Sequence, residues 1–165
     1  SWFPTRKKVN KMIVIKRIEN NVMENSQEIR RVFQISYKIE AELLGAKKFP
    51  PLQRPVAQFK ESLNDFFGYY IEDNLLAVIE MKKEETSMHI QSLVVDPDYF
   101  RKGIANGLIE FVFNYYNINR FTVETGKDNA PARQLYENFG FRLVKTYMAA
   151  EQIRKVRYQK EALKV

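Results

Sequence analysis

The sequence predicts a single α/β (α+β) domain in which helices flank a mixed, mostly antiparallel sheet. Three observations support this fold class. The chain has 165 residues, close to the size of one average domain. Strand-like and helix-like hydrophobic patterns alternate along it without an internal repeat. Hydrophobic residues make up 45% of the chain and aromatic residues 13%, which is enough for one packed core.

The first half predicts a strand, two helices and three further strands, over residues 13–18, 27–44, 55–64, 66–72, 75–81 and 88–95. Gly45 should end the first helix, and Pro55 should begin the second, which we expect to bury Phe59 and Leu63. Asp73-Asn74 is a hairpin signal between two of the strands. Because the last three strands are close in sequence, we expect an antiparallel meander.

The second half predicts a helix, a strand, a helix and a closing hairpin, over residues 103–117, 121–125, 131–138, 141–149 and 155–160. A helix separates strand 88–95 from strand 121–125, so these two should be parallel and joined by a right-handed crossover. The expected buried stripe of helix 103–117 consists of Ile104, Leu108, Phe111, Val112 and Tyr115.

The composition excludes several classes of site. The chain has no cysteine, which rules out disulfides, thiolate metal sites and a cysteine nucleophile. Its single histidine, His89, disfavours an all-protein zinc or iron site. No apolar run approaches the roughly 20 residues of a membrane span, and the N-terminus lacks the apolar core of a signal peptide. We therefore expect a cytoplasmic protein with no membrane partner.

The net charge of +7 is concentrated at the N-terminus. Arg6, Lys7, Lys8 and Lys11 lie in a segment without acidic residues, and the charge without them is an ordinary +3. We expect residues 1–11 to form a basic, disordered tail and residues 12–165 to form the domain. A tail that binds RNA remains an alternative, although no RNA-reading aromatic motif supports a nucleic-acid partner.

The segment Gln91–Gly107 has the pattern of an anion site. An apolar strand ends at Asp96-Pro97, a basic turn follows, and a helix begins near Gly103. A helix N-terminus after such a turn presents free backbone N–H groups, and Arg101 and Lys102 add positive charge there. The pattern predicts a phosphate or diphosphate ligand.

Two motifs in this half resemble the GNAT superfamily of acetyl-coenzyme A (acetyl-CoA)-dependent N-acetyltransferases. The strand end Val95-Asp96-Pro97-Asp98-Tyr99 is similar to the family's Val-x-Pro-x-Tyr, and Phe100–Ala105 aligns with (Gln/Arg)-x-x-Gly-x-(Gly/Ala). The second motif, Asn-x-x-Ala-x-x-(Leu/Phe)-Tyr-x-x-x-Gly-Phe, is matched at every fixed position by Asn129, Ala132, Leu135, Tyr136, Gly140 and Phe141. The resemblance is strongest over residues 88–141.

The resemblance implies that the fourth and fifth strands splay apart around acetyl-CoA. Main-chain N–H groups after Tyr99 would hold the diphosphate, and the N–H of Val94 or Val95 would face the thioester carbonyl. Phe100 departs from the motif, yet its backbone can still donate. The implied cofactor-binding residues are Leu93, Val94, Val95, Phe100, Arg101, Lys102, Gly103, Ile104, Ala105, Asn129, Ala132 and Tyr136.

The resemblance also implies direct attack by an amine in a ternary complex, with Tyr136 as general acid. A phenol of pKa about 10 can protonate a thiolate leaving group of pKa about 8.5. His89 is the first candidate for general base because its intrinsic pKa suits that role. Glu124, which alternates with Val123 on the predicted fifth strand, is another catalytic candidate, and Glu40 and Glu42 are further alternatives.

The acceptor site is expected between residues 37 and 59, where Glu40 and Glu42 suggest a cationic amine substrate. Aromatic residues either line that pocket or belong to the core, namely Phe49, Phe66, Phe67, Tyr69 and Tyr70. The acceptor class stays open among small amines, aminoglycosides and peptide or protein amines. A catalytically weak acyl-CoA-binding sensor is the alternative function, and the sequence leaves a homodimer open.

Overall fold

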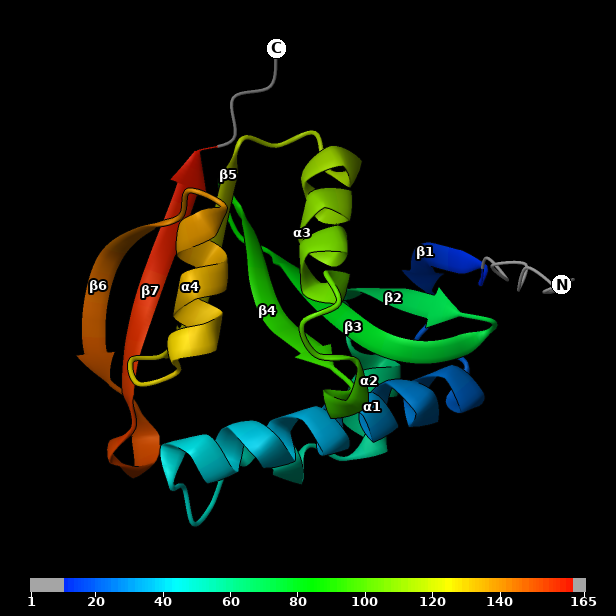
Figure 1. The fold of residues 1–165 in the computed structure, drawn as a ribbon, viewed down its shortest axis with the longest axis horizontal. Helices are drawn as coiled ribbons and strands as arrows, with labels where there is room; N and C mark the ends of the chain where they lie inside the picture. The colour runs from blue at the N-terminus through cyan, green and yellow to red at the C-terminus, as the bar shows by residue number, and fades with distance from the viewer. Residues whose placement is uncertain (1–10, 162–165) are drawn as a thin grey trace, which may run out of the picture.

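A seven-stranded sheet in the order β1-β2-β3-β4-β5-β7-β6 organises the computed structural model, which describes residues 11–161 (Figure 1). The strands are β1 (Ile13–Ile18), β2 (Asp65–Ile71), β3 (Asn74–Lys83), β4 (Met88–Val95), β5 (Arg120–Gly126), β6 (Arg142–Met148) and β7 (Arg154–Glu161). The helices are α1 (Met23–Leu44), α2 (Val56–Glu61), α3 (Ile104–Tyr115) and α4 (Ala130–Asn138), with short 3-10 helices η1 (Pro50–Gln53), η2 (Pro97–Tyr99) and η3 (Ala150–Gln152). The expected basic tail, apart from Lys11, lies outside the described residues.

The topology confirms the predicted mixed sheet. Every neighbouring pair of strands is antiparallel except β4 and β5, which are parallel and connected through α3. The expected meander is β2-β3-β4, and the expected closing hairpin is β6-β7. No helix among residues 11–161 is long and apolar enough to cross a membrane.

Strands β4 and β5 pair over only a short distance, which confirms the predicted splay. Their register covers Met88↔Phe121, His89↔Thr122 and Ile90↔Val123, and then the strands separate. On the other side of β4, the pairing with β3 shifts, so that Ser92 faces Glu80 while Ile90 faces Met81. Gln91 is therefore the extra residue of a β-bulge placed where the splay begins.

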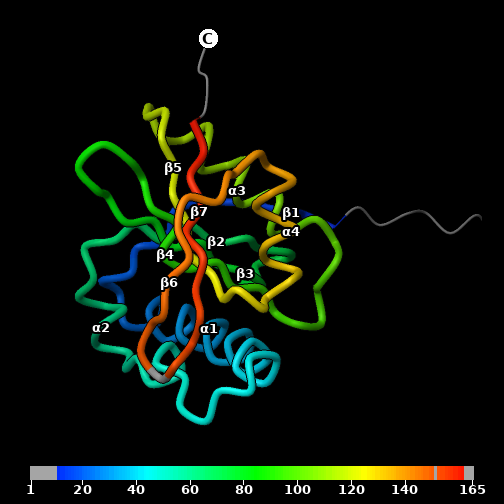
Figure 2. Tube along the Cα trace, turned by 90° about the vertical axis from the view of Figure 1, so that its left-hand side faces the viewer, coloured from blue at the N-terminus to red at the C-terminus, as the bar shows by residue number. Residues whose placement is uncertain are grey.

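Two hydrophobic clusters cover the two faces of the sheet. The adjacent residues Phe66 and Phe67 are both fully buried, but they point into different clusters because side chains alternate along a strand. The cluster of Phe67 includes Leu108 of α3 and Tyr136 of α4, whereas that of Phe66 includes Phe33 of α1. Figure 2 shows α3 and α4 on the opposite side of the strands from α2.

Several element boundaries and burial predictions need correction. Helix α1 begins at Met23, four residues earlier than expected, and ends at Gly45 as predicted, with φ 62°. Helix α2 stops at Glu61, so Leu63 lies beyond it and is fully exposed instead of buried.

The other two errors concern the meander hairpin and α3. The hairpin turn lies at Glu72-Asp73, where both residues have positive φ, one position before the predicted site. On α3, Ile109 is buried and Tyr115 is half-exposed, whereas the predicted buried stripe omitted Ile109 and included Tyr115.

Candidate functional site

The connection from β4 to α3 is the turn at which the sequence predicts anion binding. Arg101 and Gly103 have left-handed φ values of 61° and 75°. Gly103 precedes the first residue of α3, and no side chain caps this helix. The N–H groups of the first helical turn are thus available to an anion, and the partial positive charge of the helix N-terminus favours one there.

A cavity of about 690 Å³ opens beside this turn, and we call it the α3 cavity. Its walls are the turn, the free edge of β4, α4 and the C-terminal half of α1. Ten of the twelve predicted cofactor-binding residues line it. The exceptions are Val94, which is buried in the cluster on the α1 face, and Lys102, whose ammonium lies 5.3 Å from the ring centre of Tyr99.

The free edge of β4 presents two N–H groups to the splay. The N–H of Asp96 donates to the carbonyl of Leu76 on β3, at 2.8 Å. Because N–H directions alternate along a strand, the N–H of Val94 also points toward β3, and those of Leu93 and Val95 point toward the gap. Val95 already donates to Oγ of Ser36 at 3.2 Å, so the geometry favours Leu93 over Val94 and Val95 for contact with a carbonyl in the gap.

A second cavity of about 480 Å³ lies on the other side of the splay, and we call it the loop cavity. It is enclosed by the C-terminal half of α1, the loop around η1, and the separated parts of β4 and β5. Figure 1 shows that half of α1 passing below β4 and α4. The residues common to both cavities are Glu40, Leu93, Asn129, Ala132 and Tyr136. The two cavities therefore meet beside the free edge of β4.

Tyr136 stands at this junction. Its position on α4 is fixed by Asn129, whose side chain caps the helix by accepting from the N–H of Ala132 at 3.2 Å. The Tyr136 ring packs edge-on against Phe141, with ring centres 5.6 Å apart. Burial raises the pKa of the Tyr136 phenol, and the nearby Tyr37 and Glu40 raise it further. The phenol is therefore fully protonated at neutral pH.

Glu40 and Glu42 have different environments although they are close in sequence. Glu40 lines both cavities, and Nδ2 of Asn129 lies 3.4 Å from its Oε1. Burial raises the pKa of Glu40, opposed by the Asn129 hydrogen bond and by Lys155. Glu42 is exposed and is not among the described residues that line either cavity, because two positions along a helix turn a side chain away. The predicted acceptor-site role of Glu42 therefore has no support from the geometry of these two cavities.

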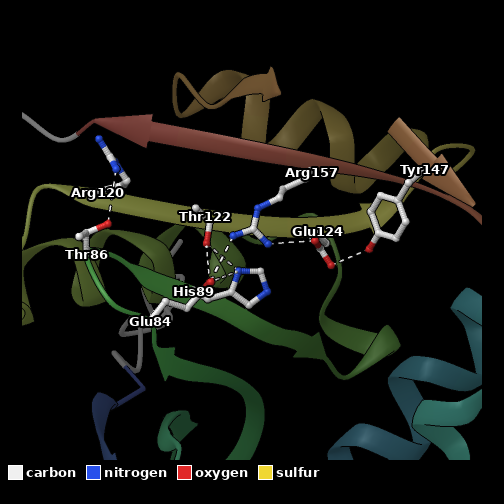
Figure 3. A network of polar contacts seen from close by, with 8 residues as sticks. All are labelled: Glu84, Thr86, His89, Arg120, Thr122, Glu124, Tyr147 and Arg157. Carbon is white, nitrogen blue, oxygen red and sulfur yellow. Dashed lines mark hydrogen bonds and ion pairs between the residues drawn. The ribbon is translucent and has the colours of Figure 1, made fainter. Parts of the chain in front are cut away.

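His89 lies in a polar network on the α1 side of the sheet (Figure 3). Its Nδ1 is 2.7 Å from Oγ1 of Thr122 and 3.3 Å from a carboxylate oxygen of Glu84. Burial lowers the pKa of His89, although the negative charge of Glu84 opposes the shift. His89 is not among the described residues that line either cavity, which removes the geometric support for its role as base.

Glu124 belongs to the same network but also lines the loop cavity. Its carboxylate accepts from the hydroxyl of Tyr147 at 2.7 Å and from Arg157 at 2.9 Å. Burial alone would raise the pKa of Glu124, but these two hydrogen bonds outweigh it and lower the pKa. Arg157 also pairs with Glu84 at 3.3 Å, so one cation is shared by two carboxylates. Glu124 is thus a permanently charged anion in the cavity wall.

A fully buried carboxylate, which the sequence analysis missed, holds the loop of the second cavity. Glu80 on β3 accepts from both terminal nitrogens of Arg54, at 2.8 and 3.0 Å, from Asn64 at 2.8 Å and from Ser92 at 3.0 Å. The Arg54 guanidinium also lies 4.1 Å from the ring centre of Phe59. The available signal was an acidic residue inside the apolar run 75–81, which requires a buried partner.

The five aromatic residues considered for the acceptor pocket divide into one that lines a cavity and four that belong to the core or pack against it. Phe49 lines the loop cavity. Phe66 and Phe67 belong to the core clusters, and Tyr69 and Tyr70 pack partly buried against those clusters. Among residues 11–161, no group of three or more histidine and acidic side chains is placed to hold a metal ion.

Comparison with known proteins agrees with this geometry. The family model described as "Acetyltransferase (GNAT) domain" matches residues 35–162. UPF0157 protein YqkA of Bacillus subtilis is 35% identical over 127 residues, which cover 76% of this chain and 37% of that protein. The chain thus spans little more than a third of that relative.

Two further proteins are similar to the chain. Streptothricin acetyltransferase of Escherichia coli is 27% identical over 126 residues, covering 73% of this chain and 72% of that protein. The crystal structure of PaiA N-acetyltransferase from Thermoplasma acidophilum, in complex with coenzyme A, has a TM-score of 0.70 at 18% identity. That match covers 91% of this chain and 99% of the other, and it shows the shared fold.

Substituting Glu80→Gln should lower the free energy of unfolding by about 3 kcal/mol, because it leaves the partly buried guanidinium of Arg54 without its anion. Chemical denaturation monitored by circular dichroism measures this. The matched control is Glu28→Gln, which breaks the exposed Arg31–Glu28 pair and should cost less than about 1 kcal/mol. Equal effects of the two substitutions would contradict the anchoring role of Glu80.

Proposed function

The chain belongs to the GNAT acetyltransferase family, whose members use acetyl-CoA, and we propose that it transfers the acetyl group to a primary amine by direct attack in a ternary complex. The observation that carries the proposal is the meeting of two cavities beside the unpaired edge of β4, with Tyr136 in the wall of both. One cavity contains the anion-binding turn, and the other contains carboxylates suited to a cationic acceptor.

The α3 cavity fits coenzyme A. The uncapped N-terminus of α3 supplies donors for a diphosphate, and the pantetheine arm can lie along the unpaired edge of β4 toward the free N–H of Leu93. A Cβ built at Gly103 has no protein atom within 4 Å, so it would project into the open space beside the turn. Glycine leaves that space free for a phosphate. Bound acetyl-CoA supplies the thioester carbonyl that the amine attacks.

In the proposed mechanism, the N–H of Leu93 stabilises the negative charge that develops on the carbonyl oxygen. A preorganised donor in a site shielded from water is worth several kcal/mol to the transition state. Tyr136 then protonates the leaving thiolate. The phenol carries its proton at neutral pH, and the burial that raises its pKa makes it a weaker acid than a free tyrosine, so donation depends on its position beside the sulfur.

The acceptor must lose a proton before it attacks. An alkyl amine of pKa about 10.4 is neutral in only about one molecule in 2,500 at pH 7, which costs roughly 4.6 kcal/mol. We assign the proton acceptor to Glu40, because its raised pKa brings it closer to neutral pH and because it borders both cavities. Glu124, with its lowered pKa, is assigned to binding of the ammonium form.

The experiment that tests this function has two stages. Isothermal titration calorimetry measures binding of acetyl-CoA, and a free-thiol release assay then measures turnover over a panel of amines. We expect binding, followed by release of coenzyme A with at least one primary amine. Tight binding with no thiol released from any amine would overturn the transferase function in favour of the alternative, an acyl-CoA-binding sensor.

Tyr136→Phe should lower kcat by about 10²-fold or more while the Kd of acetyl-CoA stays nearly unchanged, because only the proton donor is removed. Steady-state kinetics and calorimetry on the same preparation measure both values. Tyr115→Phe is the control, since Tyr115 is half-exposed on α3 and not among the described cavity-lining residues. An unchanged kcat in Tyr136→Phe would remove this residue from the acid role.

Glu40→Gln should lower kcat/KM by about 10²-fold near neutral pH and should change its pH dependence. In the wild type, Glu40 takes the proton of a bound ammonium, so kcat/KM should be level above the raised pKa of Glu40, and its logarithm should fall with a slope of one below that pKa. In the variant the amine must already be neutral, so the logarithm should rise with a slope of one up to the pKa of the amine. Glu42→Gln provides the matched control on the same helix and should match the wild type. A level profile above neutral pH in Glu40→Gln would assign the base elsewhere.

Gly103→Leu should weaken acetyl-CoA binding by at least about tenfold, since a side chain there obstructs the approach of a phosphate to the backbone. Gly45→Leu is the matched control. Both glycines have positive φ, and a Cβ built at either has no neighbour within 4 Å, so the backbone strain is similar. Only Gly103 lines the α3 cavity. Equal Kd values in the two variants would contradict the placement of the diphosphate.

A further inference from the structure

Two large apolar side chains are exposed in the wall of the α3 cavity. Phe100 has 45% of its surface exposed and Leu43 has 62%, and both line this cavity from different elements. Phe100 also occupies the motif position where GNAT proteins usually have Gln or Arg. Exposed apolar groups gathered at a concave site commonly mark contact with an apolar part of a ligand.

The chain path places Phe100 between two parts of the site. It follows the free edge of β4, which ends at Val95, and it precedes the turn at Gly103. Its own N–H is occupied by the carbonyl of Pro97, at 3.2 Å, so its side chain is what it offers to a ligand. A cofactor that extends from the β4 edge to the anion-binding turn must pass this residue.

The helices contribute different groups to the cavity. On α1, Ile39 and Leu43 are four positions apart and lie on the same face, and they line the cavity together with Ser36 and Glu40. The helices α3 and α4 contribute the carboxamides of Asn106, Gln134 and Asn138 beside apolar residues such as Leu135. We call these three carboxamides the carboxamide wall; the exposed Leu43 lies on α1.

Coenzyme A has a matching order of groups. Between its pantetheine amides and its diphosphate lies a carbon that carries two methyl groups, while the adenosine with its polar ring edges lies beyond the diphosphate. We propose that Phe100 and Leu43 together hold this dimethyl carbon of the pantoyl unit, and that the adenosine is left to the carboxamide wall. The proposal rests on the proposed function only in that both require coenzyme A in the α3 cavity.

This assignment gives the departure from the family motif a physical role. A Gln or Arg at position 100 could add a polar contact near the diphosphate, whereas Phe contributes buried apolar area when the ligand covers it. Phe100→Ala should consequently lose affinity for ligands that contain the pantoyl unit and keep its affinity for ligands that lack it. Burial of one side chain against a ligand is worth about a tenfold change in Kd.

Isothermal titration calorimetry with three ligands tests the proposal. Coenzyme A contains both parts, 4′-phosphopantetheine contains only the pantoyl part, and adenosine 3′,5′-bisphosphate contains only the adenosine part. In Phe100→Ala and in Leu43→Ala, the Kd should rise about tenfold for the first two ligands and stay within about twofold for the third. Phe100→Leu should recover most of the lost affinity, because it restores an apolar side chain.

Leu143→Ala is the control, because Leu143 is a half-exposed leucine on β6 that is not among the described residues lining the α3 cavity. It should leave all three Kd values unchanged, and thermal melts should confirm that every variant is folded. A loss confined to adenosine 3′,5′-bisphosphate would overturn the proposal in favour of stacking of Phe100 on adenine. Equal losses for both fragments, or no loss at all, would also overturn it. Wild-type protein that binds none of the three ligands would instead refute the proposed function.

Discussion

The site depends on the separation of β4 from β5 after only three paired positions. Backbone N–H groups in the middle of a sheet normally have a partner in the next strand, and leaving them without one is costly unless water or a ligand replaces it. The β-bulge at Gln91 and the splay turn the N–H groups of Leu93 and Val95 toward a gap, where Val95 donates to Ser36 and Leu93 is left for a ligand. The same gap connects the two cavities, so in the proposed reaction the unpaired edge accounts for both the place of the thioester and the route of the amine.

The electrostatics of the loop cavity follow from how each carboxylate is paired. Glu80 is saturated by four donors and has a structural role, since it ties the loop at Arg54 to the sheet. Glu124 is held by Tyr147 and Arg157, which lower its pKa. Glu40 has only a long hydrogen bond from Asn129, and burial raises its pKa. These different surroundings are the reason for the separate roles that we propose for the three carboxylates, namely anchoring for Glu80, ammonium binding for Glu124 and proton transfer for Glu40.

Local patterns in the sequence predicted most of the fold. The bounds of β1 and β4 are as expected, and the two motifs correctly located the turn before α3 and the end of α4. Leu63 was misassigned because α2 ends earlier than expected, and the other misassigned residues reflect that a pattern does not reveal which face of an element is covered. The bulge at Gln91 reverses the alternation of β4, so that Ile90 and Val94 enter different clusters and His89 turns to the α1 face. The network around Glu80 joins residues distant in sequence, which no local pattern can predict.

The most direct test of the account is a crystal structure of the protein with acetyl-CoA bound. We predict the diphosphate on the N–H groups at the start of α3, and the thioester oxygen within hydrogen-bonding distance of the N–H of Leu93, with Tyr136 beside the sulfur. A crystal grown in excess acetyl-CoA in which the ring of Phe100 fills the α3 cavity, with the nucleotide absent, would contradict it. So would acetyl-CoA bound away from the gap between β4 and β5.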